Sequence, residues 1–128
     1  MAVLKKKKTK VLGSAKLVEA IINGIQEKKG KDIVSLDLGN VKNAICDYFV
    51  ICHCDSAPHV LAVADSVDFE VEKKCGETPM HKEGYENAEW ILLDYFNVVV
   101  HVFIKEKREF YKIEQLWADA KVKEIASN

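Results

Sequence analysis

The sequence predicts an α/β sandwich, in which helices flank a mixed β-sheet, with the element order α-β-β-α-β-β-α. Segments with an apolar residue every three or four positions stand near the start, in the middle and near the end of the chain. Pairs of short segments rich in β-branched and aromatic residues separate them. Strands that alternate with helices in this way form a mixed sheet that is antiparallel at its hairpins.

A single domain is expected, because 128 residues suffice for one buried core and neither a repeat nor a linker divides them. We place this domain at residues 13–120. Residues 1–12 are expected to form a basic flexible tail, and residues 121–128 a C-terminal tail.

The first predicted helix begins near Ser14, a suitable N-cap, and ends before Gly30, which suits the position after a helix. The apolar residues that keep helical spacing between them are Leu17, Val18, Ile21, Ile22 and Ile25. Residues 32–38 alternate as a strand does and end at a Gly-Asn turn. Residues 47–54 predict a second, more apolar strand.

The second predicted helix has a clear start and a clear end. Ser56 is its N-cap, Pro58 lies in the first turn, where a missing N–H costs nothing, and Gly76 ends it. Its apolar stripe consists of Val60, Ala64, Val67, Val71 and Cys75. Residues 77–87 then form a polar, turn-rich connection.

Residues 89–104 predict a central β-hairpin whose turn is formed by Phe96 and Asn97. The partners across the strands, which share one face, are then Trp90 with Phe103, Leu92 with His101, and Asp94 with Val99. The other face must lie under helices, because it carries Ile91, Leu93, Tyr95, Val98, Val100, Val102 and Ile104. After the hairpin we expect one last helix with Phe110, Ile113 and Trp117 on one side.

The charge is divided unevenly along the chain. Five lysines lie in the first ten residues, which contain no acid, and the other residues carry 14 basic against 20 acidic side chains, a balance of −6. The basic arm is able to touch nucleic acid through Lys5, Lys6, Lys7 and Lys8, although such runs are more often solvated. No apolar run reaches the roughly 20 residues of a membrane span, and no export signal is visible, so a cytoplasmic protein with reduced cysteines is expected.

Two groups of residues suggest metal binding or catalysis, and each also has a simpler interpretation. Cys52, His53 and Cys54, with His59 nearby, suggest a metal module, but a closed zinc site needs about four ligands at suitable spacing. Cysteines packed on a buried strand are the simpler interpretation.

The second chemical hypothesis is catalysis by a pair drawn from Cys54, Asp94 and His101. No nucleophile elbow, phosphate-binding glycine loop or metalloprotease helix accompanies these residues. We therefore expect no enzymatic activity, no metal and no cofactor.

A docking surface explains the mixed face of the hairpin better. Trp90 and Phe103 share that face with Asp94 and His101. Trp and Tyr dominate the energetics of protein interfaces, and acids steer a basic partner. An aromatic cluster bordered by carboxylates thus predicts a surface that binds another protein.

A series of separate motifs occurs in order and at consistent spacing from about Leu17 to Ala120. The motifs are Asp47-Tyr48-Phe49-Val50-Ile51, Ser56, His59-Val60, Glu83-Gly84, Glu89-Trp90-Ile91-Leu92-Leu93-Asp94-Tyr95, Val99-Val100-His101-Val102-Phe103, Arg108, Phe110-Tyr111, Ile113-Glu114 and Leu116-Trp117. Together they resemble the ribosomal silencing factor (Iojap-like) family. Two positions depart from the family pattern: Phe96-Asn97 stands where a small Gly-Asp turn is usual, and Cys52-His53-Cys54-Asp55 replaces an end that usually contains Ser-Gly.

The resemblance implies a non-catalytic translation factor with a fold similar to nucleotidyltransferases but without their catalytic residues. Such a factor binds the large ribosomal subunit through a ribosomal protein of the L-fourteen family and blocks joining of the small subunit. Matched by motif, the residues expected to bind this partner are Trp90, Asp94 and Tyr95, with Glu83, Leu92, His101 and Phe103 as neighbours. A nucleotidyltransferase-related enzyme and a Cys/His metal module remain the alternatives. A homodimer of the free protein, and the balance between silencing and subunit assembly, are left open.

Overall fold

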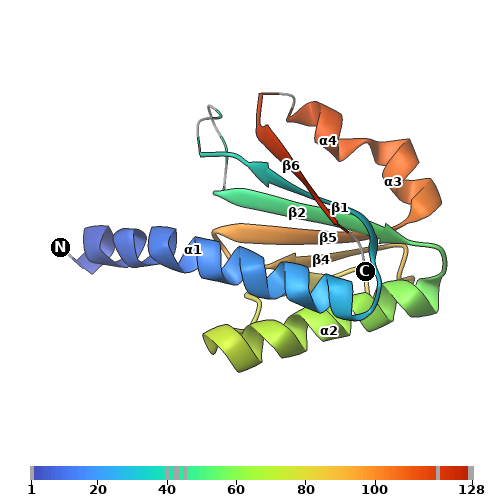
Figure 1. Ribbon diagram of the computed structural model, residues 1–128, viewed down its shortest axis with the longest axis horizontal. Helices are drawn as coiled ribbons and strands as arrows, with labels where there is room; N and C mark the ends of the chain where they lie inside the picture. The colour runs from blue at the N-terminus through green and yellow to red at the C-terminus, as the bar shows by residue number, and fades with distance from the viewer. Residues whose placement is uncertain (1, 40, 42–43, 45, 118, 127–128) are drawn as a thin grey trace.

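The computed structural model shows three layers, with a six-stranded sheet between two layers of helices (Figure 1). It describes the chain except residues 1, 40, 42–43, 45, 118 and 127–128, and it describes residues 2–13 by their backbone alone. The strand order is β3-β4-β5-β2-β1-β6. Only β2 (Tyr48–Cys54) and β5 (Val98–Ile104) run parallel among the described pairs, so the predicted mixed sheet is confirmed.

One face of the sheet is covered by α1 (Ala2–Glu27) and α2 (Ala57–Cys75), which lie side by side (Figure 1). A close approach between them depends on Gly24, where an added Cβ would lie 2.8 Å from Val67 Cα. Ser66 Oγ donates a hydrogen bond of 2.7 Å to the Gly24 carbonyl across the same contact. The main core therefore lies between this helix pair and the sheet.

The start of α1 differs from the prediction. The helix begins at Ala2, so the backbone of residues 2–12 is helical, where the sequence predicted a basic tail. Lysine and leucine are good helix formers, and no proline interrupts the segment. Ser14 is buried within the helix instead of capping it, and its Oγ donates to Asp47 Oδ2 at 3.2 Å and accepts from Asn97 Nδ2.

The second helix agrees with the prediction at both ends. Ser56 Oγ accepts from the His59 N–H at 3.3 Å, and Gly76 adopts the left-handed conformation that closes the helix, with φ of 68°. Four members of the predicted stripe are buried, while Cys75 is half-buried. The buried members are Val60, Ala64, Val67 and Val71.

The central hairpin also has the predicted register. In the pairing of β4 (Trp90–Asp94) with β5, Trp90 lies opposite Phe103 and Leu92 opposite His101. The predicted apolar face packs under α1 and α2, as expected. Phe96 in the turn has a positive φ of 76°, and its N–H donates to Asp94 Oδ1 at 2.7 Å.

Two short strands were missed. β3 (His81–Glu83) lies in the predicted connection and pairs with β4 at one edge of the sheet. β6 (Lys121–Ile125) lies in the segment predicted as a C-terminal tail and pairs with β1 (Lys31–Asp37). Both strands are short, charged and exposed, so they lack the apolar alternation that marks a half-buried strand. The partner of β6 is also distant in sequence, which local periodicity does not report.

The last helix is broken in two, α3 (Lys105–Tyr111) and α4 (Ile113–Leu116), and both lie on the opposite face of the sheet from α1 and α2 (Figure 1). The break falls at Lys112, whose φ is 48°. It separates Phe110 from Ile113, and the Phe110 side chain is 76% exposed rather than part of the core. Within the part of the chain that the structure describes, no helix combines the length and apolarity needed to cross a membrane.

Candidate protein-docking site

The sheet face that carries α3 and α4 is built around a cluster of rings, which we call the aromatic face. Its members on the strands are Phe49, Trp90, His101 and Phe103, and the segment after β5 adds Tyr111 and Trp117. Trp90 stacks on Phe103 with ring centroids 4.8 Å apart. Phe49 meets His101 edge-on at 4.7 Å and Trp117 at 5.7 Å.

A hydrogen bond fixes the central indole of this face. Trp90 Nε1 donates to His101 Nδ1 at 3.0 Å. An indole N–H is a donor only, so His101 is neutral and carries its proton on Nε2. Nε2 is buried without a hydrogen-bond partner among the described residues, and burial lowers the pKa of His101 to about 4.

The structure separates the predicted binding residues by accessibility. Glu83 is exposed, and Trp90, Leu92 and Asp94 are half-buried on neighbouring strands, with Glu83 paired to Leu92. These four side chains are accessible to a partner. His101 and Phe103 are buried beneath Trp90 and support it.

Tyr95 does not join this group. Its side chain is 3% exposed and packs in the core on the face covered by α1 and α2. The predicted contact between the Tyr95 ring and a docked protein is therefore corrected: the ring is part of the core. Two-residue alternation had already placed Tyr95 on the helix-covered face.

Accessible rings that the prediction had not assigned to the docking surface lie on α3. Tyr111 is 45% exposed, and its ring centroid lies 4.8 Å from that of Trp90. Phe110 meets Tyr111 edge-on at 5.0 Å. A single continuous helix predicts Phe110 to point inward, and nothing in the local sequence marks the break at Lys112 that turns it outward.

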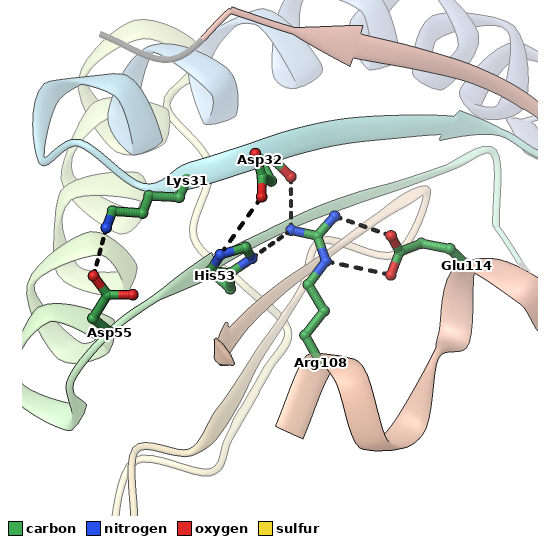
Figure 2. A network of polar contacts seen from close by, with 6 residues as sticks. All are labelled: Lys31, Asp32, His53, Asp55, Arg108 and Glu114. Atoms are coloured by element: carbon green, nitrogen blue, oxygen red, sulfur yellow. Dashed lines mark hydrogen bonds and ion pairs between the residues drawn. The ribbon is translucent and has the colours of Figure 1, made fainter. Parts of the chain in front are cut away.

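A polar network borders the aromatic face and joins β1, β2, α3 and α4 (Figure 2). Arg108 Nη1 donates to the Asp32 carbonyl at 2.7 Å and contacts His53 Nδ1 at 2.9 Å. Its Nη2 and Nε donate to the two carboxylate oxygens of Glu114 at 3.0 and 3.4 Å. Burial and the neighbouring Arg108 charge lower the pKa of His53, which keeps Nδ1 free to accept.

The Cys52-His53-Cys54 segment does not converge on one point. Both sulfurs pack in the core under α1 and α2, whereas the His53 ring lies on the opposite face beside Arg108. Cys54 and His101 likewise lie on opposite faces of the sheet, so they form no catalytic pair. Across the described residues, no group of three or more His, Cys, Asp or Glu side chains is arranged to hold a metal ion.

The sequence of this chain is similar to a known family of proteins. A family model described as "Ribosomal silencing factor during starvation" matches residues 12–128. The chain belongs to this family. The ribosomal silencing factor RsfS of Halalkalibacterium halodurans is 36% identical over 114 residues, which cover 89% of this chain and 96% of that protein. The RsfS of Bacillus subtilis is 36% identical over 99 residues, covering 77% and 82%.

A more distant relative and two solved structures are also similar to this chain. A mouse protein named "Mitochondrial assembly of ribosomal large subunit protein 1" is 28% identical over 102 residues, which cover 78% of this chain and 44% of that protein. A crystal structure of a Chromobacterium violaceum protein is similar in fold, with a TM-score of 0.76 and 32% identity over 81% of this chain and 85% of that one. A Bacillus halodurans structure gives 0.74 and 33%, covering 87% and 99%.

Proposed function

We propose that this protein binds the large ribosomal subunit through a ribosomal protein of the L-fourteen family and sterically blocks association with the small subunit, which represses translation. Membership of the ribosomal silencing factor family supports this function. The name of the mouse relative also refers to the large subunit. The mechanism requires occupancy of a surface, and no bond is made or broken.

The observation that carries the proposal is the position of Trp90. Its indole is half-buried, stacked on Phe103 and hydrogen-bonded to His101, so it is held in one orientation before a partner arrives. A large ring that is already ordered loses little conformational entropy on binding. Trp90 is therefore placed to act as the energetic centre of an interface.

Charge supports a basic partner. Asp94 and Glu83 border the exposed part of the aromatic face, and residues 11–128 carry a balance of −6. Ribosomal proteins must neutralise RNA and are commonly basic, so acids at the rim would raise the rate of association. We assign direct contact to Glu83, Trp90, Leu92 and Asp94, and a supporting role to His101 and Phe103.

The lysines at the start of α1 add a second, electrostatic contribution. Figure 1 shows the first turns of α1 extending beyond the sheet. Lys5 to Lys8 would attract the phosphates of ribosomal RNA near the docking site, and this attraction would weaken as salt is raised.

The test is sedimentation of purified large and small ribosomal subunits with and without the protein. We expect the protein to sediment with the large subunit and to reduce the fraction of joined particles. Absence of the protein from the large-subunit fraction would overturn the proposal. Nucleotide binding by this protein, which the alternative of a nucleotidyltransferase-related enzyme predicts, would then be measured by calorimetry.

Substitutions locate the surface within the same assay. Trp90→Ala is expected to weaken binding by about 2 kcal/mol or more, roughly 30-fold. Asp94→Asn removes the charge but keeps an oxygen that can accept from the Phe96 N–H, and it should slow association at low salt. Phe69→Ala, which removes an exposed ring from α2, is the control and should bind as the unmodified protein does.

A further inference from the structure

Arg108 is buried although it carries a permanent charge, with 8% of its surface exposed. Its guanidinium contacts the first strand at the Asp32 carbonyl, the second strand at His53, and α4 at Glu114 (Figure 2). A buried charge is tolerated only when it is paired and hydrogen-bonded. Arg108 meets both conditions with partners from three different segments.

The pairing with Glu114 spans the break between α3 and α4. Lys112 lies between the two residues and has a φ of 48°, a conformation that residues with a Cβ adopt at some energetic expense. Two parallel hydrogen bonds from Arg108 to the Glu114 carboxylate fix both the distance and the orientation of the segments on either side. The network therefore holds the break between α3 and α4 in place.

The contacts of Arg108 also hold α3, the helix that carries Tyr111. Tyr111 follows Arg108 by three residues on α3, so a shift of Arg108 shifts the Tyr111 ring too. That ring packs 4.8 Å from the Trp90 centroid and is partly open to solvent. Beyond the break, Ile113 is buried in an apolar cluster that includes Phe49 and Phe103 of the aromatic face, and Trp117 packs against the same cluster.

We propose that Arg108 is a positioning residue for the docking surface: by joining β1, β2 and α4 it holds the Tyr111 ring against Trp90, so that both rings contact the partner. This inference rests on the proposed function, because it assigns Tyr111 to the same interface. Tyr111 is not among the residues that the sequence predicts to bind the partner, and it is not among the proposed direct contacts Glu83, Trp90, Leu92 and Asp94.

The test compares Arg108→Lys with a variant that is destabilised elsewhere. Lysine keeps the positive charge but cannot make the parallel pair of bonds to Glu114 while also reaching Asp32 and His53. Val67→Ala, which removes buried methyl groups from α2 in the other layer, is the control for lost stability. Unfolding in urea and affinity for the large subunit are measured for both.

We expect Arg108→Lys to lower the affinity about tenfold or more, and Val67→Ala to bind as the unmodified protein does. Tyr111→Ala should weaken binding in the unmodified background and add little in the Arg108→Lys background, since the ring is already displaced. Equal effects of Tyr111→Ala in both backgrounds, or unchanged affinity of Arg108→Lys, would overturn the proposal. If Arg108→Lys does not fold, Glu114→Gln takes its place, because it removes only the negative charge that pairs with Arg108.

A measurement without ribosomes separates this inference from the proposed function. The contact between the Tyr111 and Trp90 rings is observed by proton NMR in the free protein. It should persist in Val67→Ala and disappear in Arg108→Lys. If the unmodified protein fails to bind the large subunit, the proposed function is overturned. If the ring contact persists in Arg108→Lys, the positioning role of Arg108 is overturned, whatever the result with ribosomes.

Discussion

Trp90 Nε1 donates to His101 Nδ1 at 3.0 Å, a contact between diagonal neighbours on two antiparallel strands. The bond links the half-exposed Trp90 ring, at the centre of the proposed docking surface, to a buried ring on β5. It fixes the indole orientation and at the same time satisfies the acceptor of a buried histidine. One hydrogen bond thus contributes to stability and orients the ring proposed to bind the partner.

Trp90→Phe should remove this bond while keeping the stacking on Phe103. The buried Nδ1 atom of His101 then loses its donor, which is expected to lower the free energy of unfolding by about 1–3 kcal/mol. Urea unfolding measures the change. The double variant Trp90→Phe/His101→Phe removes both partners and should be more stable than the sum of the single effects predicts; strict additivity would contradict the assigned bond.

His101 makes the stability depend on pH. Its pKa is about 4 in the folded protein because of burial, against roughly 6.5 when unfolded. Between these values the unfolded chain binds more protons, so the contribution is complete above pH 6.5 and is lost as the pH falls toward 4, in total about 3 kcal/mol. The lowered pKa of His53 acts in the same direction.

The contribution of His101 is isolated by measuring unfolding between pH 7 and 4.5 in the unmodified protein and in His101→Phe. The variant should lose less stability on acidification. Parallel curves for the two proteins would show that His101 titrates normally.

Gly84 and Gly76 both have a positive φ, but only Gly84 lies close to another segment, so the two positions separate backbone strain from steric overlap. Both have positive φ, 89° and 68°, but an added Cβ at Gly84 would lie 2.0 Å from the Trp90 carbonyl oxygen, whereas nothing lies within 4 Å at Gly76. Gly76→Ala should therefore cost only about 1–2 kcal/mol of conformational strain. Gly84→Ala should cost at least about 3 kcal/mol, because strain and overlap add. Equal losses of stability in thermal unfolding of the two variants would contradict the close approach of Gly84 to the Trp90 carbonyl.

The cysteines should divide into two classes of reactivity. Cys52 and Cys54 are fully buried, and burial raises the pKa of Cys54 to about 12 and that of Cys52 further. Cys46 and Cys75 are half-buried, and burial raises their pKa as well, that of Cys46 to about 11. Because these two thiols are partly accessible, a thiol reagent at pH 8 is expected to label Cys46 and Cys75 slowly in the native protein, and Cys52 and Cys54 only as the chain unfolds. Rapid labelling of Cys52 or Cys54 in the native protein would show that the core opens at β2.

The sequence predicted most of the fold because its signals are local. Ser56 and Gly76 bound α2 as their capping chemistry requires, and alternation along β4 and β5 gave the register and both faces of the hairpin. The candidate site was predicted in part. Motif matching selected Trp90 and Asp94, which are half-buried at the aromatic face, but it also selected Tyr95, which the alternation along the strand buries.

What the sequence by itself determined is which side chains share a face of the hairpin, since the two-residue period of a strand follows from backbone geometry alone. Only the tertiary structure decided which of those side chains remain accessible. The break at Lys112 and the contacts of Arg108 with distant segments place α3 and α4 over one part of the aromatic face and leave Trp90 and Tyr111 partly open. Those contacts join residues far apart in the chain, so no local pattern encodes them.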